Sequence, residues 1–140
     1  MALKHHFRYD DDWRYMPMAF WVHVEQDGNP WWESTHYSPP APRHLSGRGY
    51  PILNIEVRDE TLCFSSAAQL HAFIETLSRT PLPSTMRLSA QRGERHGPNT
   101  HWLSRLPAWM KTAKFRERML PRLRQLAQSL QDDAAQTGWQ

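Results

Sequence analysis

Apolar residues in the first half of the chain follow a period of two, which is typical of half-buried strands. Residues 18–25 alternate in this way, and the Asp27-Gly28-Asn29-Pro30 segment that follows is a strong turn signal. Residues 31–37 are rich in aromatic and β-branched side chains, so the two segments predict a hairpin. Residues 53–57 and 61–64 alternate in the same manner and predict a second hairpin.

A period of 3.6 residues begins at Ser66 and predicts a helix over residues 66–78. Ser66 and Gln69 have the spacing of a capping box, in which two side chains satisfy free backbone N–H groups at a helix start. The Thr80-Pro81-Leu82-Pro83 segment stops this helix. Its apolar stripe, which we expect to lie on the sheet, is formed by Leu70, Phe73, Ile74 and Leu77.

A second helical pattern runs from about residue 108 to residue 130 and contains Pro121. Proline inside a helix removes one hydrogen bond and clashes with the preceding turn. We therefore expect either a kink or a split into two helices at this point. The pattern also contains an apolar seam, which packs either on the sheet or on a second copy of the chain, and which is formed by Met119, Leu123, Leu126 and Leu130.

These elements predict a single α+β domain over residues 1–140. We expect a mainly antiparallel sheet of four or five strands, with residues 85–90 as the optional fifth, packed by the central helix and the kinked or split C-terminal helix. The Pro- and Gly-rich residues 38–51 predict a loop, and residues 1–12 and 132–140 are expected to be flexible tails.

The net charge of +3 hides an uneven distribution along the chain. Residues 1–78 hold six Lys or Arg and ten Asp or Glu, whereas residues 79–140 hold eleven and four. A basic half of this kind is typical of a chain that meets something anionic, which is a nucleic acid, an acidic protein surface, or the acidic half of the same chain.

Four cations of the C-terminal pattern share one narrow face of a straight helix, namely Lys111, Lys114, Arg118 and Arg122. A row of cations at this spacing can follow a phosphate backbone. Arg105, Arg92 and Arg95 extend the predicted nucleic-acid surface toward the preceding loop. The alternative interpretation is a face that is solvated or paired with the acidic half. Arg116 falls inside the apolar arc, and a kink at Pro121 would rotate Arg122 out of the row.

The first predicted hairpin carries a tryptophan cluster that includes Trp21, Trp31 and Trp32. Either both faces of the hairpin are covered, or an aromatic patch is exposed and binds a partner. The second hypothesis is therefore a protein-interaction surface or a homodimer interface. Its contacts are either Trp21, Trp31 and Trp32, or the seam through Met119, Leu123 and Leu126.

Signals for catalysis are weak. The eight histidines match no metal-binding spacing, so we predict neither a metal site nor another cofactor. Cys63 lies alone on a predicted strand, where a cysteine is usually an inert small hydrophobic residue. Residues 97–102 gather amide, hydroxyl and imidazole groups, with His96 just before them, and support a third hypothesis of a small enzyme.

The leading hypothesis is a non-enzymatic binding module that contacts nucleic acid, or a complex associated with it, through the basic C-terminal helix. No segment has the length of apolar sequence that a membrane span needs, and the N-terminus lacks the apolar core of a secretory signal. With a single cysteine no disulfide can form within the chain, so a cytoplasmic location is expected.

Overall fold

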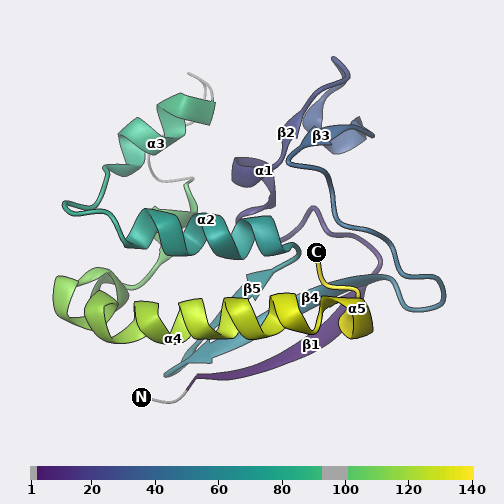
Figure 1. Cartoon of the computed structure of the whole chain (residues 1–140). Coiled ribbons are helices and arrows are strands. Elements are labelled where there is room, and N and C mark those ends of the chain that lie inside the picture. The colour runs from purple at the N-terminus through teal and green to yellow at the C-terminus, as the bar shows by residue number, and fades with distance from the viewer. Residues whose placement is uncertain (1–2, 93–100) are drawn as a thin grey trace.

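A computed structural model describes residues 3–92 and 101–140 of the chain (Figure 1). It contains a small antiparallel sheet, a separate pair of short strands, and helices, so the α+β class is confirmed. The elements are, in order, β1 (Lys4–Asp10), α1 (Ala19–Val22), β2 (Val24–Glu25), the 3₁₀ helix η1 (Trp31–Glu33), β3 (Tyr37–Ser38), β4 (Tyr50–Val57), β5 (Glu60–Phe64), α2 (Ala67–Leu77), α3 (Thr85–Arg92), the 3₁₀ helices η3 (Trp102–Arg105) and η4 (Ala108–Lys111), α4 (Ala113–Asp132) and α5 (Ala134–Thr137).

The main sheet has three strands in the order β1-β4-β5, and both pairings are antiparallel. The predicted hairpin over residues 53–57 and 61–64 is confirmed as β4 and β5, joined by a two-residue turn. Strands β2 and β3, of two residues each, pair with one another in a separate two-stranded sheet. The expected sheet of four or five strands is therefore not confirmed. The predicted loop over residues 38–51 connects β3 and β4, although its first residue belongs to β3 and its last two residues belong to β4.

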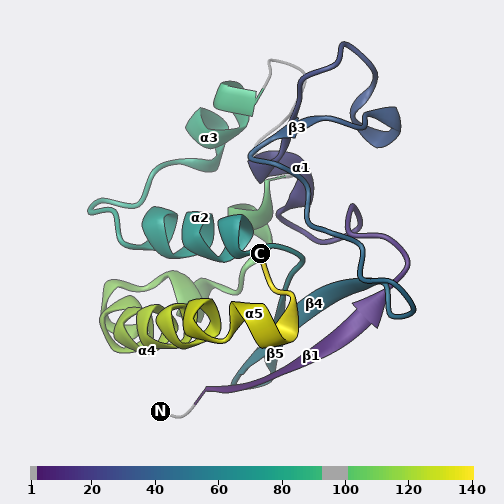
Figure 2. The ribbon, with the colours of Figure 1, turned by 45° about the vertical axis from the view of Figure 1, so that its right-hand side comes forward.

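Helices α2 and α4 run side by side in opposite directions on one face of the sheet (Figures 1 and 2). The predicted central helix is confirmed as α2, whose first turn is capped by the Ser66 hydroxyl, which accepts a hydrogen bond from the N–H of Gln69. The side chain of Gln69 in turn accepts from the N–H of Ser65, one residue before the expected partner. The stripe through Leu70, Phe73, Ile74 and Leu77 is buried in the main core.

The prediction that residues 1–12 form a tail was wrong. Lys4–Asp10 pairs along its whole length with β4, from Lys4 opposite Glu56 to Asp10 opposite Tyr50. Phe7 packs against the main core, although most of the other side chains of β1 are polar. The backbone pairing with β4, and not a clear apolar alternation, therefore stabilises this strand.

The predicted strand over residues 18–25 was also largely wrong, because Ala19–Val22 is a helical turn and β2 holds two residues. Residues 31–33, expected to be extended, form η1. The rings of this region pack around Trp31, whose indole N–H donates to the carbonyl oxygen of His23 at 2.7 Å. This tertiary packing overrides the local alternation.

The predicted strand over residues 85–90 is the helix α3. Ser84 precedes it, and the Ser84 hydroxyl accepts a hydrogen bond from the N–H of Arg87 at 3.1 Å. The side chain of Leu88 points into the core cluster, whereas Met86 and Arg87 are exposed. The segment is therefore amphipathic at the helical period, and its short length concealed that period in the sequence.

Residues 132–140 are not a tail either. Trp139 is 3% exposed, and its ring meets the ring of Phe7 at a centroid distance of 5.5 Å. The backbone oxygen of Gln140 accepts a hydrogen bond from the N–H of Ala67 at 2.7 Å. The end of the chain thus closes the core between β1 and α2.

Because Trp139 fills this space, we expect Trp139→Ala to lower the free energy of unfolding by about 3 kcal/mol. Urea denaturation followed by circular dichroism measures the change. Gln140→Ala is the matched control, since the Gln140 side chain is exposed and the substitution keeps the backbone oxygen. Equal stability of the two variants would contradict the placement of Trp139.

Candidate functional site

Helix α4 carries three of the seven cations that the sequence analysis predicts as nucleic-acid contacts. The hydroxyl of Thr112 caps its start and accepts a hydrogen bond from the N–H of Phe115 at 3.2 Å. The helix continues through Pro121, so the alternative of a split into two helices was wrong (Figure 1). Pro121 lacks the N–H that would bind the carbonyl of Glu117, but both residues are exposed, so water can replace the missing donor.

Three exposed cations follow one another at intervals of four residues on α4, namely Lys114, Arg118 and Arg122. Each interval turns by about 40° around the helix and advances by about 6 Å along it. The three charges therefore occupy an arc of about 80° over a length of about 12 Å. We call these three residues the α4 basic face.

Two other cations of the segment do not join the α4 basic face. Lys111 belongs to η4, ahead of the cap of α4, and is half-buried, so the expected row of four is a row of three. Arg116 lies on the arc that packs on the core. Its guanidinium donates to the carbonyl oxygens of Lys111 at 3.1 Å, Leu77 at 2.9 Å and Arg79 at 3.1 Å. Arg116 thus joins α4 to the C-terminal end of α2, where a cation is favoured.

In the part of the chain that the structure describes, the acidic half forms no ion pair with the α4 basic face. Within residues 3–92 and 101–140, no cation of α4 takes part in an ion pair. The acidic side chains that pair with an arginine do so elsewhere. Three of these pairs join near neighbours in the sequence, namely Arg8–Asp10, Arg14–Asp12 and Arg79–Glu75, and the fourth joins Glu25 to Arg92 at the end of α3.

Arg92 is not available to a nucleic acid. Its guanidinium donates to Glu25 at 2.6 Å and to the carbonyl oxygen of Phe20 at 2.9 Å, and it lies over the Phe20 ring. The Arg92 side chain is 11% exposed, so the prediction for this residue was wrong. Arg95 lies outside the described residues. Arg105 is exposed but belongs to η3, beside β5, and does not lie on α4.

The apolar seam of α4 packs inward. Met119, Leu123 and Leu130 are buried in the main core, and the half-buried Leu126 packs against it. The alternative in which this seam meets a second copy is therefore corrected, because its side chains are already covered by the same chain.

The predicted tryptophan cluster is split between a core and the surface. Trp31 is buried in a second hydrophobic cluster, and the half-buried Trp21 packs on the main core. Trp32, in contrast, is 55% exposed and its ring meets that of Tyr15, which is 72% exposed, at 5.2 Å. Trp31 is thus covered, whereas Trp32 stays at the surface, and partner binding by the exposed rings remains a prediction.

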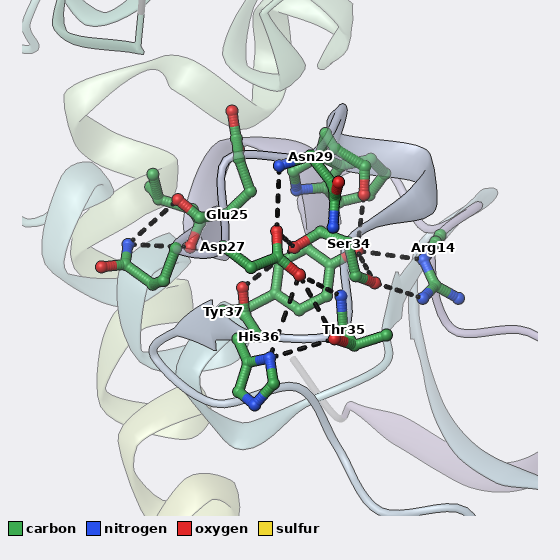
Figure 3. Close-up of polar contacts among 11 residues, drawn as sticks. Arg14, Glu25, Asp27, Asn29, Ser34, Thr35, His36 and Tyr37 are labelled. Atoms are coloured by element: carbon green, nitrogen blue, oxygen red, sulfur yellow. Dashed lines mark hydrogen bonds and ion pairs between the residues drawn. The ribbon is translucent and has the colours of Figure 1, made fainter.

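The loop between β2 and β3 is organised by Asp27 (Figure 3). Its carboxylate accepts hydrogen bonds from the Ser34 hydroxyl at 2.7 Å, the Thr35 N–H at 2.9 Å and the Asn29 N–H at 3.2 Å. These bonds, that of Ser34 first, hold the pKa of Asp27 well below its usual range. A carboxylate that is saturated in this way fixes a loop and is a poor proton acceptor.

Of the 97–102 segment that suggested an enzyme, the structure describes His101 and Trp102, since residues 97–100 lie outside the described range. His101 carries the imidazole of this segment. It is 4% exposed, and burial lowers its pKa to about 4. Its Nδ1 accepts a hydrogen bond from the N–H of Leu103 at 3.1 Å, so Nε2 carries the hydrogen of the neutral ring. Trp21 packs on this ring at 4.6 Å, and both line a cavity of about 240 Å³ beside α2 and α3.

A buried Ser–His contact was missed by the sequence analysis. Nδ1 of His23 lies 2.9 Å from the carbonyl oxygen of Pro39, which can accept only, so Nε2 accepts from the Ser66 hydroxyl at 2.8 Å. Burial lowers the pKa of His23 and keeps the ring neutral. Because both residues are buried and the same hydroxyl caps α2, this pair joins segments of the fold and offers no nucleophile to a substrate.

Among the described residues, no group of three or more His, Cys, Asp or Glu side chains lies close enough together to hold a metal ion. No helix in this part of the chain is long and apolar enough to cross a membrane. Comparisons with protein-family models, with curated proteins and with solved structures found no match to this chain. The candidate site therefore depends on the geometry and charge described above.

The buried His101 predicts a loss of stability in mild acid. The unfolded ring takes up a proton near pH 6.5, whereas the folded ring does so near pH 4. Stability therefore falls as the pH is lowered through this window, by up to about 3 kcal/mol. We expect His101→Gln to reduce this fall, measured by urea denaturation at pH 7.5, 6, 5 and 4. The exposed His44→Gln is the control, and an unchanged slope in His101→Gln would contradict the prediction.

Proposed function

We propose that this protein is a non-enzymatic binding module that contacts the phosphate backbone of a nucleic acid through Lys114, Arg118 and Arg122 of α4. The observation that supports the proposal is the absence of any ion pair to these three exposed cations among the described residues. A surface row of unpaired cations attracts a polyanion and releases the counterions bound to it.

The rest of α4 supports the same interpretation. Its opposite side is fixed to the core through Met119 and Leu123, and Arg116 clamps its first turns to the end of α2. The α4 basic face is therefore carried on a rigid element, and its three charges keep their spacing. Glu117 is exposed about 60° around the helix from Lys114, just outside the arc of the three cations. Arg124 lies on the same side as Glu117 and faces the shallow groove between α2 and α4.

A surface of three cations predicts weak, salt-dependent binding without base recognition. If three phosphates are contacted, raising the salt concentration from 50 to 200 mM should weaken binding about 20- to 40-fold. Base stacking is not part of the proposal, since the α4 basic face includes no aromatic side chain.

Reversal of the three charges tests the proposal. We expect the triple variant Lys114→Glu, Arg118→Glu and Arg122→Glu to lose at least 10-fold in affinity for a fluorescein-labelled 20-nucleotide single strand and for the matching duplex. The slope of log K against log salt should become shallower by about 2 to 3. Fluorescence anisotropy at several salt concentrations measures both quantities, and circular dichroism verifies that the variant is folded.

The matched control reverses three exposed arginines that lie away from α4, in the variant Arg43→Glu, Arg48→Glu and Arg87→Glu. The two variants have the same net charge. An equal loss of affinity in both would show that net charge alone is responsible and would overturn the assignment to α4, as would the absence of binding by the unmodified protein at low salt.

The exposed pair of Tyr15 and Trp32 favours a second candidate function, that of a self-association module. Two large rings that are more than half exposed and in contact with each other form an apolar patch, which is typical of an interface. Trp31, the neighbouring residue, is buried and meets the Trp32 ring at 4.9 Å, which fixes the position of the patch.

Substitution of Trp32 and of its buried neighbour Trp31 distinguishes a role at the surface from a role in the core. We expect Trp32→Ser to change the free energy of unfolding by less than about 0.5 kcal/mol, whereas Trp31→Ala should cost about 3 kcal/mol or more. If the patch mediates self-association, sedimentation equilibrium of the 16.5 kDa chain at 0.1 to 1 mM should show a mass above the monomer value, and Trp32→Ser should restore the monomer. A monomeric parent protein would exclude the second candidate.

A further inference from the structure

Strand β5 is an edge of the main sheet, and within the described residues no strand pairs with its outer side. The turn between β4 and β5 closes at Val57 opposite Glu60, so the hydrogen-bonded pairs with β4 involve Glu60, Leu62 and Phe64. The N–H and C=O groups of Thr61 and Cys63 therefore point away from β4. Among the described residues these groups have no hydrogen-bond partner. An edge of this kind is a template for another strand.

A groove of about 150 Å³ lies along the whole of this strand. All five residues of β5 line it, together with apolar side chains at one end and along its far wall. Met18 and Phe73 are buried residues of its lining. The wall opposite β5 is formed by Trp102, the first residue of η3, and by Leu106, which follows η3. The groove thus combines free backbone groups on one side with apolar side chains on the other, which is the combination that binds an extended peptide.

We propose that this groove binds an extended peptide segment that adds to β5 as a fourth strand, places an apolar side chain against Trp102, and places an acidic residue beside Arg105. Arg105 is exposed, lines the groove, and forms no ion pair among the described residues. A carboxylate of the peptide is the group that complements it. This site is separate from the α4 basic face.

The wall of the groove decides between a peptide and a second copy of the chain. Residues of η3 line the groove opposite β5, so a second copy that paired with this edge would bring its own η3 and helix layer against the same wall, whereas a peptide brings no such layer. Backbone pairing contributes most of the affinity in such a complex, and the side-chain pockets contribute the selectivity.

Selection from a random heptapeptide library displayed on phage, against the intact protein, tests this proposal. We expect enriched peptides to alternate apolar and polar residues and to contain an acidic residue. The Thr61→Pro variant is the target for counter-selection, which removes phage that bind elsewhere on the protein. Proline lacks the outward N–H group and is tolerated on an edge strand. In anisotropy measurements with the synthesised peptides, Thr61→Pro should weaken binding at least 10-fold, whereas Thr61→Val, which keeps the N–H, should change it less than 3-fold.

Two further measurements define the result. Arg105→Gln should weaken the acidic peptides at least 5-fold and leave versions with Gln in place of the acid unchanged. Hydrogen exchange of the Thr61 and Cys63 amides should slow when peptide is bound. Failure to enrich peptides over the Thr61→Pro background would overturn the proposal, as would a dimer of the parent protein that Thr61→Pro dissociates. None of these results depends on Lys114, Arg118 or Arg122.

Discussion

The burial of β4 on both faces is the constraint on which the rest of the structure depends. Leu53 and Ile55 point into the main core under α2 and α4. Ile52 points to the opposite face, where it belongs to the second hydrophobic cluster together with Trp31. A single strand therefore joins two hydrophobic clusters that would otherwise be independent. Strand β1 on one side and β5 on the other complete its backbone hydrogen bonds, which a strand buried on both faces requires.

The elements predicted correctly from the sequence are those whose signal is local. The cap at Ser66 and the apolar stripe that follows it predict α2. Two alternating segments joined by a short turn predict β4 and β5. The errors have a tertiary cause. Trp31 and its neighbours fold residues 19–33 into turns around a second core, and Lys4–Asp10 is a strand because β4 needs a partner. No local period reports either of these contacts.

The candidate site divides in the same way. The helical period alone places Lys114, Arg118 and Arg122 on one side of α4, and their exposure follows from the burial of the opposite side. Which cations are free cannot be read from spacing, because pairing is a long-range property. Arg92 is held by Glu25, 67 positions earlier, and Arg105 lies beside β5. The contact between His23 and Ser66 likewise joins residues that no motif relates.

The position of β1 also has a consequence for folding kinetics. Its partner β4 begins at Tyr50, so their pairing must close a long loop, and this entropic cost comes before any gain from the contact. Without β1, β4 would present an unpaired edge rich in Ile and Leu beside β5. An exposed edge of this kind is a template for pairing with another chain. The largely polar β1 thus covers this edge and itself becomes the outer strand of the sheet.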